Sequence, residues 1–196
     1  MANSSLQEEL ARCCRVADQM VTCHSILRDS LYRKALTLDV TILVLSAWIT
    51  ATAFVDPAIA AHLAIGSLSP TVTIGAIATA TFCLSLFQLK ADWKQRSDRH
   101  AEAARVYSRT KFALGRAMDQ AASTEGEQKE ALAKYYSVGD QHIAIPDGKF
   151  NKLKQKHLLK IAVSKAISKN PGAPRLLLWF KIRLIDSVNL WRGDDK

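Results

Sequence analysis

The sequence predicts an all-α membrane protein: an antiparallel hairpin of two transmembrane helices, with long cytoplasmic helical extensions and further helices at its C-terminus. The main observation is a pair of uncharged or nearly uncharged apolar segments, residues 36–55 and 71–89. At about 1.5 Å per residue, each is long enough to cross the hydrocarbon core of a bilayer. Asp56-Pro57 and Ser69-Pro70 bracket the connection with turn-forming residues. Two long helices joined so closely are expected to pack side by side and antiparallel.

The charges around the two segments predict the orientation of the hairpin. Basic residues precede the first segment and follow the second, at Arg28, Arg33, Lys34, Lys90, Lys94, Arg96 and Arg99. The connection contains only Asp56 and His62 as ionisable residues. Because basic flanks stay on the cytoplasmic side, both termini are expected in the cytoplasm. The alternative is the core hairpin of a soluble protein, because Ala, Ser and Thr lower the hydrophobicity of both segments and the mean hydropathy of the chain is -0.01.

Helical periodicity extends the hairpin in both directions. From Leu6 to Ile49, apolar and small residues recur at alternating steps of four and three, so residues 1–35 are predicted to form a cytoplasmic helix that runs unbroken into the first span. Residues 90–122 are predicted to continue the second span as a cytoplasmic helix. The shared register there, with a break at Arg96, consists of Phe82, Leu86, Leu89, Trp93, His100, Ala103, Tyr107 and Leu114.

The second span carries small and polar residues along one helical face. The candidate pore-lining or helix-packing residues are Thr71, Gly75, Ala78, Thr81, Ser85 and Gln88 of this span, with Ser46 and Thr50 of the first. Polar residues at membrane depth require a structural or functional reason. They either pack on a neighbouring helix or line water in a pore made from several copies of the hairpin. Because Ser and Thr can also bond to their own helix backbone, both interpretations stay open.

Two histidines are predicted to form a polar layer next to the membrane. Folding the hairpin about residue 63 places His24 within one helical turn of His100. Such a pair acts either as a hydrogen-bonded contact that fixes the register or as a sensor of protons or of a ligand.

Residues 123–196 predict a C-terminal helical region. Thr124 and Glu127 have the spacing of a capping box, which starts a short helix ending near Tyr136. A turn-rich loop over 139–149 follows, and then a helix over about 151–168.

The helix over 151–168 and its N-terminal flank carry a basic stripe. Its members are Lys149, Lys152, Lys156 and Lys160, and the opposite apolar face consists of Phe150, Leu153, His157 and Ile161. No acidic residue lies between 151 and 174, so the lysines repel one another unless an anion is close. The stripe is a candidate site for a lipid headgroup, a nucleotide or an RNA backbone, or else a solvated face. His157 is expected to be a core residue.

A final helix over 175–191 is apolar nearly all round, but it is too short and too charged to span a bilayer. It is expected to be buried against other helices, shared between subunits or laid into the headgroup layer. Burial in an oligomer is the interpretation we favour.

No catalytic constellation stands out. The sequence has no Gly-rich phosphate loop, no metal-ligand spacing and no nucleophile elbow. Cys13, Cys14, Cys23 and Cys83 are expected to be reduced thiols, as is usual on the cytoplasmic side. A zinc site made from the first three with His24 would lack any standard spacing. We therefore expect neither an enzyme nor a bound cofactor or metal.

The layout resembles the SLATT family, the two-transmembrane effector domains of bacterial conflict systems. The resemblance rests on the cytoplasmic first helix, the hairpin over 36–89, the stretch from His100 to Tyr107 in the following helix, and the helical tail over 151–160 with its His157. The very apolar last helix and the absence of a fused sensor domain differ from the family pattern.

This resemblance implies an effector that oligomerises in the bacterial inner membrane. On activation it would form a pore or disrupt the membrane, causing cell death or growth arrest in anti-phage defence. Its partners would be membrane lipid, further copies of itself, and a separate sensor or second messenger from a cyclic-nucleotide or reverse-transcriptase system. The alternative is a membrane-anchored module that binds RNA or a nucleotide and forms no pore.

Overall fold

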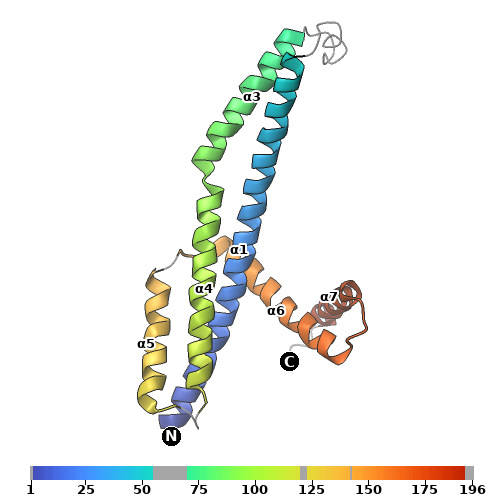
Figure 1. The fold of residues 1–196 in the computed structure, drawn as a ribbon. Coiled ribbons are helices and arrows are strands. Elements are labelled where there is room, and N and C mark those ends of the chain that lie inside the picture. The colour runs from blue at the N-terminus through green and yellow to red at the C-terminus, as the bar shows by residue number, and fades with distance from the viewer. Residues whose placement is uncertain (1, 55–69, 120–122, 142, 193–196) are drawn as a thin grey trace. The chain divides into compact units, whose positions relative to one another are not determined.

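The computed structural model describes residues 2–54, 70–119, 123–141 and 143–192, and this part of the chain is helical, with no strand (Figure 1). The predicted all-α fold is therefore confirmed. Asp56-Pro57, His62 and Ser69 lie outside the described residues. The helices are α1 (Ala2–Ala53), α3 (Pro70–Ala91), α4 (Trp93–Ala117), α5 (Glu125–Gln141), α6 (Asp147–Lys169) and α7 (Arg175–Arg192).

The chain divides into two compact units. Residues 27–101 form what we call the hairpin unit, and residues 1–26 with 102–196 form the helical unit. Both α1 and α4 contribute to each unit. The predicted continuity of the first helix is confirmed, since α1 runs unbroken over 52 residues.

In the hairpin unit α1 and α3 lie side by side (Figure 1). We call the row of residues by which one helix packs on the other its seam. The seam of α1 follows the predicted periodicity, and its buried or half-buried residues are Leu27, Leu31, Ala35, Leu38, Ile42, Leu45, Ile49 and Thr52. Residues at these steps share one face of a helix, so a single uninterrupted helix keeps them all against its partner.

The seam of α3 differs from the prediction. Phe82, Leu86 and Leu89 are exposed, and the residues that face α1 include Thr81, which is buried, and Gln88, which is half-buried. Each of these two lies one position before a residue of the predicted seam. The predicted register was therefore correct for His100 and beyond but wrong within the span.

The physical reason is a break at Asp92. Among the described residues other than glycine, Asp92 is the one with a positive φ, 45°. Aspartate tolerates this left-handed conformation better than most residues. The backbone bonds continue on both sides, from Asp92 N to Gln88 O at 3.2 Å and from Arg96 N to Asp92 O at 3.1 Å. One left-handed residue rotates the following helix about its axis relative to α3. The register difference of one residue in α3 corresponds to a rotation of about 100°.

The helical unit has a core to which α1, α4 and α5 contribute. Its buried cluster consists of Leu10, Cys13, Ala17, Leu114, Ala117 and Leu132. The predicted capping box starts α5: Thr124 N donates to Glu127 Oε2 at 2.7 Å, and Glu127 N donates to Thr124 Oγ1 at 3.4 Å. α5 ends at Gln141 rather than near Tyr136, and α6 begins at Asp147, so the connecting loop is shorter than predicted.

Candidate functional site

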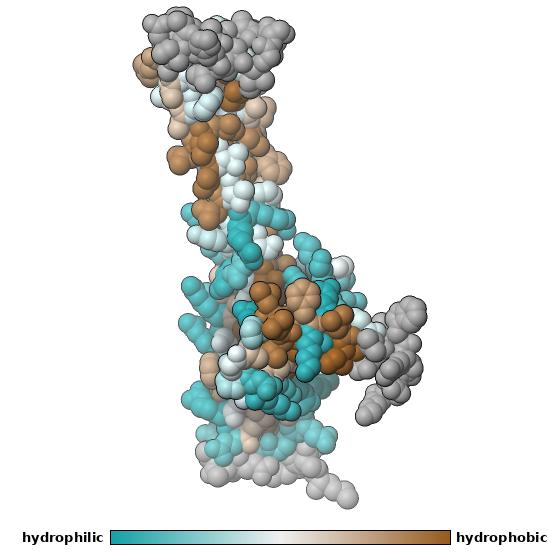
Figure 2. Space-filling model, turned by 90° about the vertical axis from the view of Figure 1, so that its right-hand side faces the viewer, coloured by the Kyte–Doolittle hydropathy of each residue, from teal (hydrophilic) through white to brown (hydrophobic). Residues whose placement is uncertain are grey.

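The hairpin unit exposes most of its apolar surface. α1 and α3–α4 are both long and apolar enough to cross a membrane, yet only 17 % and 6 % of their most apolar stretches are buried. Exposed side chains include Leu43 at 69 %, Phe82 at 63 % and Leu89 at 80 %, and apolar residues cover much of the hairpin in Figure 2. The core helix of a soluble protein would be mostly buried, and neither stretch is.

Polar and small residues occupy positions next to the seam on both helices. On α1, Ser46 and Thr50 are exposed and directly follow the seam residues Leu45 and Ile49. Asp39 has the same relation to Leu38. A residue that follows a seam position is rotated from it by about 100°. These three side chains therefore lie on one flank of α1.

α3 repeats the arrangement. Ala78 and Ser85 are exposed and follow the half-buried Ile77 and Leu84, and Thr71 lies seven residues before Ala78. Because both helices are right-handed and run in opposite directions, the flank that follows the seam lies on the same side of the pair in each. We call the polar and small residues of this combined surface the polar face; they are Asp39, Ser46, Thr50, Thr71, Ala78 and Ser85. The exposed apolar residues Leu43, Phe82 and Leu89 follow the seam residues Ile42, Thr81 and Gln88, so they border the polar face on the same flanks. The Gln88 side chain joins the two flanks at one end by donating a hydrogen bond to the Asp39 carboxylate.

Three hydroxyl groups of the predicted site bond to their own helices. Thr50 Oγ1 donates to Ser46 O at 2.9 Å, Ser85 Oγ to Thr81 O at 2.9 Å and Thr81 Oγ1 to Ile77 O at 2.8 Å. Such bonds satisfy the donors without water. Each hydroxyl oxygen keeps a lone pair that can accept from water or from another helix. The polar face can therefore exist in lipid and still contact a polar partner.

Gly75 has no close neighbour in the described chain. A Cβ atom added there would meet nothing within 4 Å. Within the hairpin, therefore, close packing does not require a glycine at this position.

The two histidines of the predicted polar layer are both buried, at 2 % exposure for His24 and 5 % for His100. His24 belongs to the helical unit, where its ring stacks on Tyr107 with a centroid distance of 5.6 Å. His100 belongs to the hairpin unit. The expected pairing of the two histidines stays a prediction.

A cavity of about 570 Å³ lies beside His24 in the helical unit, and most of its lining is aromatic or apolar. The aromatic lining residues are Tyr107, Tyr135, Tyr136 and Phe150. Tyr136 Oη donates to Glu9 Oε1 at 2.7 Å, which raises the pKa of Tyr136 to about 12. Sequence reasoning missed this cavity because its walls come from segments far apart in the chain.

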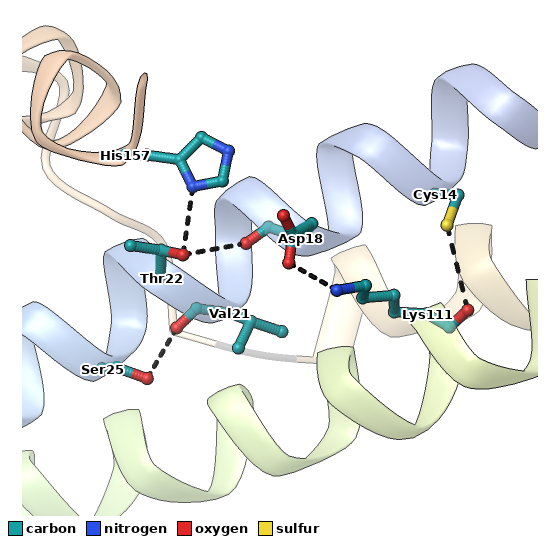
Figure 3. Close-up of polar contacts among 7 residues, drawn as sticks. All are labelled: Cys14, Asp18, Val21, Thr22, Ser25, Lys111 and His157. Atoms are coloured by element: carbon teal, nitrogen blue, oxygen red, sulfur yellow. Dashed lines mark hydrogen bonds and ion pairs between the residues drawn. The ribbon is translucent and has the colours of Figure 1, made fainter. Parts of the chain in front are cut away.

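His157 is held in the interior, as expected of a core residue. Its Nδ1 lies 3.0 Å from Thr22 Oγ1, and Thr22 Oγ1 lies 3.2 Å from Asp18 O (Figure 3). Because Asp18 O can only accept, the threonine proton points to it, and Nδ1 must be the protonated ring nitrogen. Burial lowers the pKa of His157.

The Asp18 carboxylate binds a second helix. Lys111 Nζ lies 2.7 Å from Asp18 Oδ1, so an ion pair joins α4 to α1 one turn from Thr22 (Figure 3). Both side chains are more than one third exposed, at 40 % and 37 %, so this pair contributes well under 1 kcal/mol. Its value is in orienting α4 on α1.

The four lysines of the basic stripe are exposed, whereas Leu153 and His157 on the other side of α6 are buried. Within the described part of the chain, none of Lys149, Lys152, Lys156 and Lys160 forms an ion pair. The stripe is thus available to an anion.

Comparisons with protein families, with curated proteins and with solved structures find no match.

Proposed function

We propose that this chain is a membrane effector of the SLATT type. Its α1–α3 hairpin crosses the bacterial inner membrane, with both termini cytoplasmic. Several copies assemble and, when activated, open a conductance that kills or arrests the cell during phage infection. The proposed trigger is a separate sensor or a second messenger, as the resemblance implies.

One observation carries the proposal: the hairpin combines an exposed apolar surface with the polar face. Exposure of Leu and Phe side chains to lipid costs no free energy, whereas their exposure to water does. A single hairpin cannot surround a channel, so a polar face that lines water requires further copies. When copies meet through this face, Ser46, Thr50, Ala78 and Ser85 either pack together or line water.

The decisive experiment measures how chemical modification at a defined position changes the current. Purified protein is reconstituted in planar bilayers, and a cysteine is placed at either Ser85 or Phe87 in a Cys83→Ser background. Position 85 belongs to the polar face, whereas Phe87 directly precedes the seam residue Gln88, so it lies on the other flank of the same helix, where it is 52 % exposed. A charged, membrane-impermeant thiol reagent should reduce the current of S85C and leave that of F87C unchanged.

Two results would contradict the proposal. Pore formation would be excluded if no trigger produced a current, either with the purified protein in bilayers or in cells that express it. Equal modification of S85C and F87C would show that the polar face does not line water.

The second candidate function is a membrane-anchored module that binds RNA or a nucleotide without forming a pore. The exposed basic stripe of α6 favours it. Charge reversal at Lys152, Lys156 and Lys160 separates the two candidates. A binding module would lose its ligand, whereas an assembled pore would keep its conductance.

A further inference from the structure

A cleft between α6 and α7 combines cationic and apolar walls. It has a volume of about 830 Å³. Its cations are Lys152, Lys156 and Arg183, and its apolar walls include Leu158, Leu159 and Trp179. The Arg183 guanidinium lies 4.9 Å from the centre of the Trp179 ring. Such a cleft fits a ligand with an anionic head and an aliphatic body.

The outer face of α7 is apolar and exposed. Leu176, Leu177, Phe180 and Leu184 are exposed at 71 %, 64 %, 56 % and 64 %. On the inner side of this part of the helix Leu178 is buried, at 9 %, and Trp179 and Ile182 are half-buried. Grouped exposed leucines of this kind indicate a surface that another apolar phase covers.

The charge of the same region indicates what kind of surface covers these leucines. Residues 151–192 contain seven lysines and three arginines against a single acidic residue, Asp186. A protein interface usually excludes lysine from its core, and the binding of single-stranded RNA typically uses aromatic rings on which bases stack. Here the Trp179 ring is occupied by Arg183 and by Phe180, whose ring centroid is 5.0 Å away. Aliphatic side chains beside cations are the combination that an anionic bilayer surface accepts.

We propose that the α6–α7 pair docks onto an anionic bilayer surface. Lys152, Lys156 and Arg183 contact the phosphates of anionic headgroups, while Leu176, Leu177, Phe180 and Leu184 enter the boundary of the acyl chains. This inference rests on the proposed membrane function and adds to it a lipid class and a second attachment. Docking therefore depends on lipid charge, which crossing of the bilayer by the hairpin does not.

The test is amide hydrogen exchange of the full chain in lipid nanodiscs. One nanodisc contains phosphatidylcholine alone, and the other contains phosphatidylcholine with phosphatidylglycerol. Peptides from residues 175–185 should exchange at least about tenfold more slowly in the anionic nanodisc, and high salt should remove the difference. Peptides from α5 should exchange equally in both and serve as the folding control.

A triple variant, K152Q/K156Q/R183Q, should lose the protection. Each cation near an anionic surface is worth about fivefold in partitioning, so three are worth on the order of a hundredfold. The matched control is K129Q/K134Q, which removes two exposed lysines of α5 and should keep the protection.

Three results would overturn the inference. Equal protection of α7 in both nanodiscs would indicate burial between subunits. Protection by a single-stranded oligoribonucleotide, without any effect of anionic lipid, would assign the surface to RNA. Unchanged exchange in every condition would show that nothing docks there. Failure of the chain to enter either nanodisc would instead contradict the proposed membrane function.

Discussion

Replacing Leu114 by alanine should destabilise the helical unit more than any comparable change on the surface of α4. Leu114 is fully buried, at 0 % exposure, in the cluster that joins α1, α4 and α5. Burial of a leucine side chain and the cavity left by its removal together cost about 2–5 kcal/mol. The surrounding helices relax only partly around such a gap, so we expect about 3 kcal/mol.

Cys13 provides the assay for this change. It lies in the same cluster at 2 % exposure, so a thiol reagent reaches it only when the unit opens locally. A loss of about 3 kcal/mol raises the open population on the order of a hundredfold, since about 1.4 kcal/mol is a factor of ten. Labelling of Cys13 in detergent, followed by mass spectrometry, should accelerate by that factor. Cys83, which is exposed on α3, should react at an unchanged rate.

Phe112→Ala is the matched control, because Phe112 is 70 % exposed and only two residues away. A surface substitution of this kind changes stability by about 0.5 kcal/mol or less, so labelling of Cys13 should change by no more than about twofold. If Leu114→Ala accelerated labelling no more than Phe112→Ala does, the packing argument for this core would be refuted.

Thr124→Ala removes the hydroxyl of the capping box and should destabilise α5 by about 1 kcal/mol, visible as roughly fivefold faster amide exchange in its first turn; unchanged exchange would mean that the cap contributes nothing. Burial lowers the pKa of His157, so below pH ~6.5 the unfolded chain binds a proton that the folded chain does not. The free energy of unfolding should therefore fall as the pH drops from 7 to 5, and His157→Gln should flatten this slope; a slope that persists would belong to other groups. The hydrogen bond to Glu9 raises the pKa of Tyr136 to about 12, so Glu9→Gln should shift part of the tyrosinate absorbance to lower pH, whereas an unaltered titration would contradict the Glu9 contact.

The seam of α1 could be predicted from sequence because nothing interrupts its helix. Ala35, Ile42 and Ile49 stay in phase through a constant rotation per residue. In α3 the same reasoning misplaced the seam on Phe82 and Leu89, since one left-handed residue resets the phase. A single aspartate between two good helical segments does not reveal a positive φ in the sequence.

Long-range partners were equally inaccessible to sequence reasoning. The apolar periodicity of α6 predicted that His157 would be buried, but it could not indicate Thr22, which is 135 residues earlier in the chain. The same holds for Lys111 and Asp18, separated by 93 residues. Periodicity indicates which face of a helix is buried, whereas the partner depends on how the helices pack. The capping box of Thr124 and Glu127 was predictable because its geometry is local.

Polar-face residues such as Ser46 and Ser85 directly follow seam residues, Leu45 and Leu84, that hold the hairpin together. Polarity of the exposed flank and packing of the hairpin therefore depend on neighbouring but different residues. A change at Ser46 or Ser85 alters what the hairpin offers to its surroundings, and a change at Leu45 or Leu84 alters whether the hairpin holds together. Natural drift or engineering can accordingly retune the first without sacrificing the second.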